Sequence, residues 1–150
     1  MNEEYMRMAL IEAHKAFKKG EVPIGAVVVK DGKILAKAHN TRQRSKNAVN
    51  HAEIIAISRA CKKNHDWRLE NAEIYVTLEP CPMCAGAIAN ARIQTCYYGA
   101  ADKTSTTNLA QQIFQDVRLN HKVDSFGGIL ENECASLLKD FFANKRKDKQ

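Results

Sequence analysis

Two short segments, His51-Ala52-Glu53 and Pro80-Cys81-Pro82-Met83-Cys84, constrain the fold of this chain more than any other feature. Imidazole and thiolate are ligands that zinc favours, and a catalytic zinc site takes three protein ligands and leaves a fourth position for water. A structural zinc site is normally closed by four ligands, and no further Cys or His continues the pattern. If both segments serve one metal, the chain must fold so that they lie side by side.

Each segment alone is a weak signal. The Cys81-x-x-Cys84 spacing also serves redox pairs and structural zinc fingers, and a lone His51 at the start of a helix is more often an ordinary surface or cap residue. In this order, with a proline just before the first cysteine, the two segments match the pattern H-x-E…P-C-x-x-C of zinc-dependent nucleobase deaminases. A structural or vestigial metal site is the alternative.

Glu53 is a carboxylate beside the predicted metal that need not bind it. We expect it to be the catalytic proton carrier, taking a proton from the attacking water, passing it to a ring nitrogen and later protonating the departing ammonia. His51 is predicted to open one helix, and Cys81 and Cys84 another. Helix N-termini favour thiolates, and the i,i+3 spacing brings both sulfurs to one face.

The pattern of apolar residues predicts an α/β domain. Helical periodicity or composition indicates helices at 6–17, 52–60, 82–90, after 108 and from about 131 into the C-terminal tail. Strand patterns occur at 24–29, 34–36, 73–78, 95–99 and near 123, with Asp31-Gly32 as a hairpin turn. Gly20 is the expected cap after the first helix, Asn50 the N-cap of the second, and Asn108 with Gln111 a capping box. This order predicts helices that cover a mixed sheet.

Length and cysteine content indicate one domain, 1–150, in a reducing compartment. The chain has 150 residues and five cysteines, an odd number. With two cysteines as metal ligands, the other three are interpreted as reduced packing residues (Cys61, Cys96 and Cys134). The acidic start Met-Asn-Glu-Glu-Tyr is unlike a signal peptide, and no apolar run reaches the length of a membrane span. The predicted location is the cytoplasm.

The formal net charge is +6, which is compatible with a polyanionic partner or with a solvated basic surface. The basic residues gather in three places: Arg42, Arg44 and Lys46; Arg59, Lys62 and Lys63; and a C-terminal tail from about 145 to 150. The first cluster is the most informative, because it lies just before the predicted zinc ligand His51.

Nearly the whole chain resembles the bacterial tRNA adenosine deaminases. The resemblance rests on Gly20–Ala26, His39-Asn40, His51–Ile54, Trp67–Leu69, Val76–Ala87, Ala91–Ile93, Arg118–Val123, Gly128–Leu130, Glu133–Ala135 and Asp140–Phe142. It implies a cytidine-deaminase-like fold, a three-layer α/β/α arrangement around a mixed five-stranded sheet, with one zinc ion per chain and a homodimer. It also implies deamination of adenosine to inosine at the wobble position of an arginine tRNA with anticodon ACG, bound through its anticodon stem-loop.

The same resemblance implies three substrate-binding residues. Asn40 matches an asparagine that hydrogen-bonds the target base, and Pro23 and Ile24 match positions that line the base pocket. Each also has a plain structural interpretation, because an asparagine after a strand often caps a turn and Pro and Ile suit a hairpin.

Two other functions remain open from the sequence. A deaminase of a free nucleobase or nucleoside, such as guanine, cytosine or cytidine, would share the whole metal chemistry. A non-catalytic zinc module that binds RNA is a different class of protein, and it would have no use for Glu53 or for an open coordination position.

Overall fold

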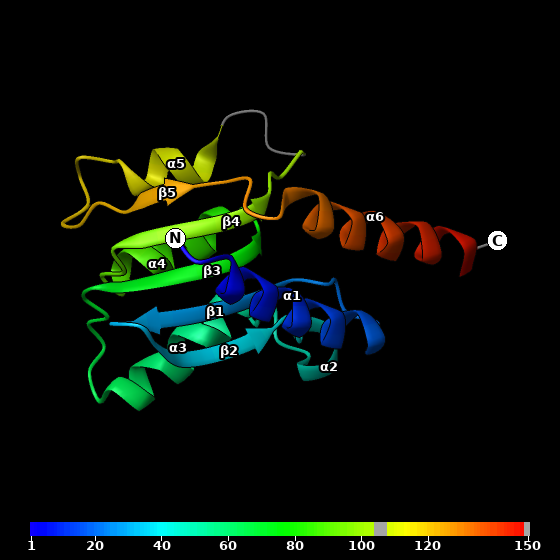
Figure 1. Ribbon diagram of the computed structural model, residues 1–150, viewed down its shortest axis with the longest axis horizontal. Coiled ribbons are helices and arrows are strands. Elements are labelled where there is room, and N and C mark those ends of the chain that lie inside the picture. The colour runs from blue at the N-terminus through cyan, green and yellow to red at the C-terminus, as the bar shows by residue number, and fades with distance from the viewer. Residues whose placement is uncertain (104–107, 149–150) are drawn as a thin grey trace.

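The computed structural model describes residues 1–103 and 108–148, and its centre is a five-stranded sheet with the strand order β2-β1-β3-β4-β5. The strands are β1 (Gly25–Lys30), β2 (Lys33–His39), β3 (Ala72–Leu78), β4 (Thr95–Ala100) and β5 (Asp124–Phe126). β1 runs antiparallel to both β2 and β3, whereas β3, β4 and β5 are parallel (Figure 1). The predicted mixed sheet of five strands is confirmed.

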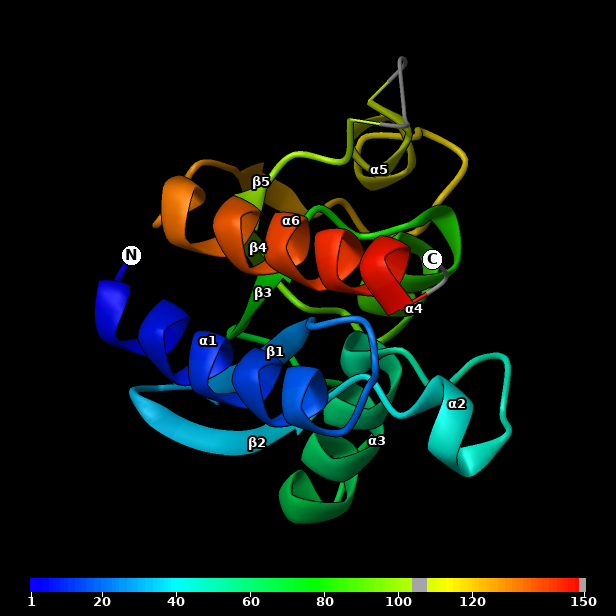
Figure 2. The same ribbon diagram turned by 90° about the vertical axis from the view of Figure 1, so that its right-hand side faces the viewer.

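Helices cover both faces of this sheet. They are α1 (Glu3–Lys18), α2 (Arg42–Ser45), α3 (Ala52–Asn64), α4 (Pro82–Asn90), α5 (Leu109–Phe114) and α6 (Glu131–Asp148). α1 and α6 pack on one face, and α3 and α4 on the other, with α5 against α4 and β5 (Figures 1 and 2). The predicted three-layer α/β/α arrangement is therefore confirmed.

The alternation of side chains along the strands builds two cores. Along β1, Val27 and Val29 point toward α1, where they pack with Met6 and Ala9, while Ala26 and Val28 point toward α3. Burial of apolar surface on both faces is the main stabilising contribution to such a layered domain. Gly25 allows α1 to lie close to the sheet, because a Cβ there would collide with the backbone of α1.

Several predicted helix boundaries are confirmed and two are wrong. Gly20 follows α1 with a φ of 77°, the left-handed conformation expected of a glycine after a helix. The N-cap of α3 is His51, not Asn50, whose side chain donates to Ser45 instead. Asn108 precedes α5 in a left-handed conformation with no side-chain cap hydrogen bond, so the predicted capping box is not formed. The polar run Thr-Ser-Thr-Thr at 104–107, which the sequence indicates to be a loop, lies outside the described residues.

The buried face of α6 consists of Cys134, Leu137 and Phe141, whereas Phe142 is 46% exposed. All five cysteines fall within the described residues, and none of them forms a disulfide. In the described part of the chain, every helix is too short or too polar to cross a bilayer.

Candidate metal centre and adjoining pocket

The carboxyl ends of β2, β3 and β4 meet at one edge of the sheet, and the candidate site is built there. Because β1 is antiparallel to its two neighbours, β2 and β3 point the same way, and β4 is parallel to β3. Loops at the carboxyl ends of strands are the usual place for sites in α/β proteins. The segment after β2 leads to Asn40 and His51, and the segment after β3 leads to Cys81 and Cys84.

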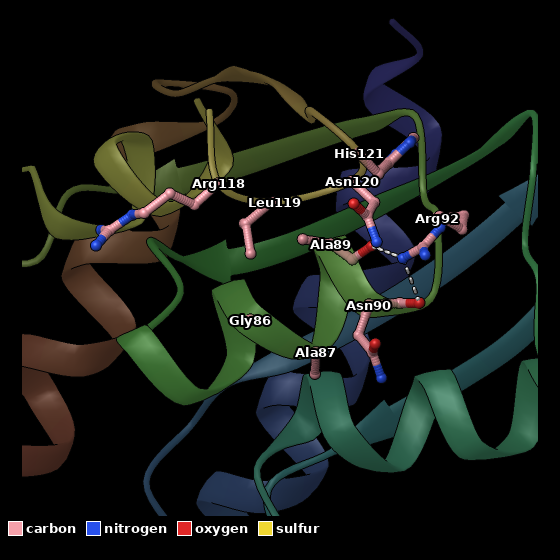
Figure 3. Close-up of a pocket in the computed structure, with 9 residues that line it drawn as sticks. All are labelled: Gly86, Ala87, Ala89, Asn90, Arg92, Arg118, Leu119, Asn120 and His121. Atoms are coloured by element: carbon pink, nitrogen blue, oxygen red, sulfur yellow. Dashed lines mark hydrogen bonds between the residues drawn. The ribbon is translucent and has the colours of Figure 1, made fainter. Parts of the chain in front are cut away.

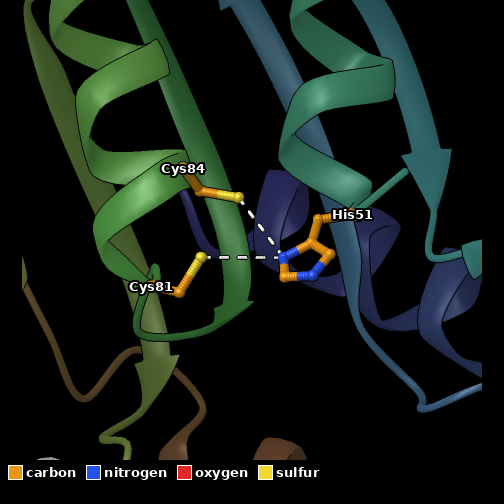
Figure 4. A group of neighbouring side chains, drawn as sticks. All are labelled: His51, Cys81 and Cys84. Atoms are coloured by element: carbon orange, nitrogen blue, oxygen red, sulfur yellow. Dashed lines mark hydrogen bonds between the residues drawn. The ribbon is translucent and has the colours of Figure 1, made fainter. Parts of the chain in front are cut away.

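Two helix N-termini place the three candidate ligands. His51 is the N-cap of α3, and Cys81 is the N-cap of α4, with Pro82 at the first helical position, where its missing N–H costs no hydrogen bond. Because α3 and α4 pack against each other on the same face of the sheet, their first turns lie side by side. Figure 4 shows the imidazole of His51 turned toward both sulfurs.

The spacing of the three ligand atoms fits tetrahedral zinc. His51 Nδ1 lies 3.7 Å from Cys81 Sγ and 3.5 Å from Cys84 Sγ, and all three ligand atoms lie within 4.8 Å of one another. Zinc bonds of about 2.3 Å to sulfur and about 2.0 Å to nitrogen, at a tetrahedral angle, require N···S separations of about 3.5 Å. His51, Cys81 and Cys84 are therefore arranged as one cluster with the geometry of a zinc site.

The two thiols differ in pKa because they share a hydrogen bond. The hydrogen bond from the Cys84 thiol, together with backbone N–H groups of the first turn of α4, lowers the pKa of Cys81 to about 5. The same hydrogen bond and burial raise the pKa of Cys84. A helix N-terminus thus already stabilises one thiolate, and a divalent cation between the sulfurs favours the second.

Glu53 lies in the first turn of α3 and is only 4% exposed. Burial raises the pKa of its carboxyl group, and the negative charge of Cys81 raises it further, while a hydrogen bond from Cys84 opposes the shift. A carboxylate that is held out of water beside the cluster accepts a proton more readily than one in solution. This environment suits a group that carries protons during a reaction.

A pocket of about 190 Å³ adjoins the cluster at His51. Of the three predicted substrate-binding residues, Ile24 and Asn40 line this pocket, whereas Pro23 is buried and is not among the lining side chains. Asn40 is 6% exposed, donates to the carbonyl of Val22 (3.3 Å) and accepts from the backbone N–H of Arg42 (3.0 Å). These two hydrogen bonds agree with the structural interpretation of Asn40 as a turn residue. The same turn brings Asn40 to the pocket.

Two buried carboxylates near the site were not predicted. Glu21 lines the pocket and is 1% exposed. Glu79 is 8% exposed, accepts a hydrogen bond from the backbone N–H of Asp102 (3.0 Å) and thereby ties the end of β3 to the segment after β4. The sequence offered one signal, the position of these residues: each is followed by an apolar or proline residue, and each lies in a segment that leads into or out of a buried strand.

Comparison with known proteins agrees with this site. The family model of MafB19-like deaminases matches residues 1–146. The tRNA-specific adenosine deaminase of Bacillus subtilis (strain 168) is 47% identical over 150 residues, which cover 99% of this chain and 93% of the relative.

Solved structures give the same result. A structure from a study of A-to-I editing by tRNA:A34 deaminases at the wobble position of transfer RNA superposes with a TM-score of 0.85, at 41% identity, and covers 91% of this chain and 99% of the other. A guanine deaminase from Bacillus subtilis matches over less of its length, with a TM-score of 0.64 at 39% identity, covering 67% of this chain and 66% of the other. The chain belongs to the MafB19-like deaminase family and, within it, to the tRNA-specific adenosine deaminases.

Proposed function

We propose that this protein hydrolyses the wobble adenosine of a tRNA to inosine and releases ammonia, with an arginine tRNA of anticodon ACG as its substrate. The observation that carries this proposal is the His51, Cys81 and Cys84 cluster with the buried Glu53 beside it. The full-length similarity to tRNA-specific adenosine deaminases supports the choice of substrate. The reaction replaces the exocyclic amine of adenine with an oxygen from water.

One zinc ion per chain is the proposed cofactor, held by His51, Cys81 and Cys84. When bound, zinc supplies a water whose pKa is lowered to about 7 in well-studied zinc hydrolases. The protein contributes a helix N-terminus that stabilises the thiolates, and it contributes the fixed orientation of the imidazole.

Glu53 is the proposed catalytic residue, because it is the buried carboxylate next to the three ligands. It takes one proton from the attacking water as the new C–O bond forms, and delivers a proton to the adjacent ring nitrogen. It then takes the second proton from the hydroxyl group of the tetrahedral adduct and passes it to the amine as the C–N bond breaks, so that ammonia leaves and Glu53 returns to its initial charge. Its raised pKa suits both directions of transfer.

The pocket beside His51 is the proposed site of the flipped base, with Asn40, Ile24 and Pro23 as substrate-binding residues. Asn40 and Ile24 line it, and Pro23 is a buried residue between the lining residues Val22 and Ile24. The exposed Arg42 and Arg44 lie on α2 at the same edge. Their positive charges support the proposed binding of an anticodon stem-loop, because phosphate contacts supply much of the affinity in protein–nucleic acid complexes.

Deamination of a free base or nucleoside is the competing function. The similarity of this chain to a guanine deaminase structure supports this alternative. One assay separates the two. The purified protein is incubated with an ACG-anticodon arginine tRNA transcript and, separately, with adenosine, cytidine and guanine. We expect inosine at the wobble position and no ammonia from the free compounds. Ammonia from a free compound alone would overturn the tRNA assignment.

A homodimer is also proposed, with the outer surface of α4 as its interface. This surface carries two adjoining hollows that share Ala87 and Asn90. One, of about 240 Å³, lies toward α3, and the other, of about 420 Å³, lies toward the segment 118–121 (Figure 3). Two of the apolar side chains that line these hollows are partly exposed: Trp67 at 50% and Leu119 at 40%. Exposed aromatic residues of this kind are enriched in protein interfaces.

We expect Trp67→Glu to convert the dimer to a monomer, because it removes the exposed indole ring from the interface and places a charge there. Size-exclusion chromatography with light scattering measures the mass. The matched control is Phe126→Glu, since Phe126 is 55% exposed but lies on the edge strand β5. If both variants stay dimeric, or if the wild-type protein is monomeric, the α4 surface is not a dimer interface.

The protein is further proposed to act in the cytoplasm as one domain over residues 1–150. Five cysteines without a disulfide suit a reducing compartment, and one continuous sheet links the first strand with the last.

A further inference from the structure

Glu21 is a buried carboxylate whose role lies outside the metal cluster. It follows α1 in the segment that leads to β1, and it is 1% exposed. Within residues 1–103 and 108–148, no lysine, arginine or histidine forms an ion pair with it. Burying an ionised carboxylate without a counter-charge is costly unless hydrogen bonds replace its water. The hydrogen bonds that Glu21 accepts must therefore offset the cost of its burial.

Both oxygens of Glu21 bind the first turn of α2. Oε1 accepts the backbone N–H of Gln43 at 3.0 Å, and Oε2 accepts that of Arg44 at 2.7 Å. These are the N–H groups that an N-cap side chain normally satisfies, but the N-cap of α2, Thr41, makes no such bond. Glu21 therefore caps α2 from a distant part of the sequence.

This cap determines where one wall of the pocket lies. A four-residue helix is too short to be stable by itself, so α2 depends on contacts with its surroundings. Asn40, which lies just before α2, makes two hydrogen bonds to the segment that contains Glu21. Its backbone N–H donates to the carbonyl of Ile24 (3.1 Å), and its side-chain amide donates to the carbonyl of Val22 (3.3 Å). The segments 21–24 and 40–44 thus form one hydrogen-bonded unit, and its residues line the pocket beside His51.

We propose that Glu21 is a positioning residue for substrate binding: it fixes α2 so that Asn40, Arg42 and Gln43 hold the base and its flanking phosphates at the metal cluster. This inference rests on the proposed function. Glu21 is not part of the ligand cluster, so it acts on the bound position of the substrate and not on the chemistry at the metal. Its loss should therefore raise KM much more than it lowers kcat.

Glu21→Gln tests this role with a side chain of the same size. Its amide retains one acceptor oxygen but turns an NH2 group toward the second N–H of α2, so one charge-assisted hydrogen bond is lost. We expect KM for the anticodon stem-loop to rise roughly tenfold, with kcat within about threefold of wild type. Zinc content should remain unchanged, and amide hydrogen exchange at Gln43 and Arg44 should become faster.

Glu12→Gln is the matched control, because Glu12 is also a buried, hydrogen-bonded carboxylate (5% exposed) but lies on α1 and bonds Lys15 and His39. It should lower stability without the change in KM. A Glu21→Gln variant with unchanged KM, or one that loses zinc, would overturn the positioning role. If the wild-type protein makes no inosine, the proposed function fails. The cap on α2 is then judged by hydrogen exchange, which needs no substrate, and unchanged exchange overturns it.

Discussion

Replacing Glu53 by alanine should abolish deamination while zinc remains bound. The three ligand atoms belong to other residues, so the metal cluster keeps its donors, but the carboxylate in the first turn of α3 that would move protons between water, ring nitrogen and amine is removed. We expect kcat to fall by at least about 10³-fold, within the range of general acid–base contributions. Inosine formation on the ACG-anticodon stem-loop gives the rate, and elemental analysis gives the zinc content.

Glu53→Gln separates the proton-transfer role from the shape of the site. Glutamine fills the same space and retains hydrogen-bonding atoms, but it cannot exchange a proton at neutral pH. It should be nearly as inactive as the alanine variant, again with zinc retained. Turnover within tenfold of wild type in either variant would remove Glu53 from the mechanism.

The second large effect is expected at a zinc ligand. Cys84→Ser replaces a buried thiolate donor by a hydroxyl, which is a poor zinc ligand, so the protein should lose both its zinc and its activity. Zinc bound only by the folded state stabilises that state by about 2.7 kcal/mol when free zinc is 100 times Kd. For a domain of this size the loss corresponds to a Tm lowered by roughly 5 to 10 °C. Calorimetry and zinc analysis measure both quantities.

Cys96→Ser is the matched control for this experiment. Cys96 is fully buried on β4 and is not in the ligand cluster, so the same substitution changes the core without removing a donor atom. The control should keep its zinc and respond to a chelator as the wild-type protein does. Equal zinc content in Cys84→Ser and wild type would show that Cys84 is not a ligand.

The metal cluster was predictable because its chemistry depends on residue type and spacing. Histidine and cysteine are the residue types that zinc favours in the deaminase pattern, and His51, Cys81 and Cys84 have the spacing of that pattern. Pro82 marks the start of the helix that carries the two cysteines. The strands were predictable for a related reason: runs such as 25–30 and 72–78 are rich in β-branched and apolar residues and are buried on both faces.

What the sequence did not reveal depends on contacts between distant residues. α2 is a short, basic, exposed segment, and its cap comes from Glu21, about twenty residues earlier in the chain, so no local pattern marks it. The capping box at Asn108 and Gln111 matched a local pattern, but the left-handed backbone of Asn108 prevents it. Phe142 is apolar and near Phe141, yet the buried face of α6 is occupied by residues 134, 137 and 141.

The two edges of the sheet have a consequence for how copies of the chain can associate. β5 is only three residues long, and the register between β1 and β2 is interrupted by a bulge between Val28 and Val29. On β2, Lys33 and Lys37 are exposed. Short edge strands, bulges and lysines each hinder the addition of a foreign strand. These features of β5 and β2 therefore protect both edges of the sheet against edge-to-edge aggregation.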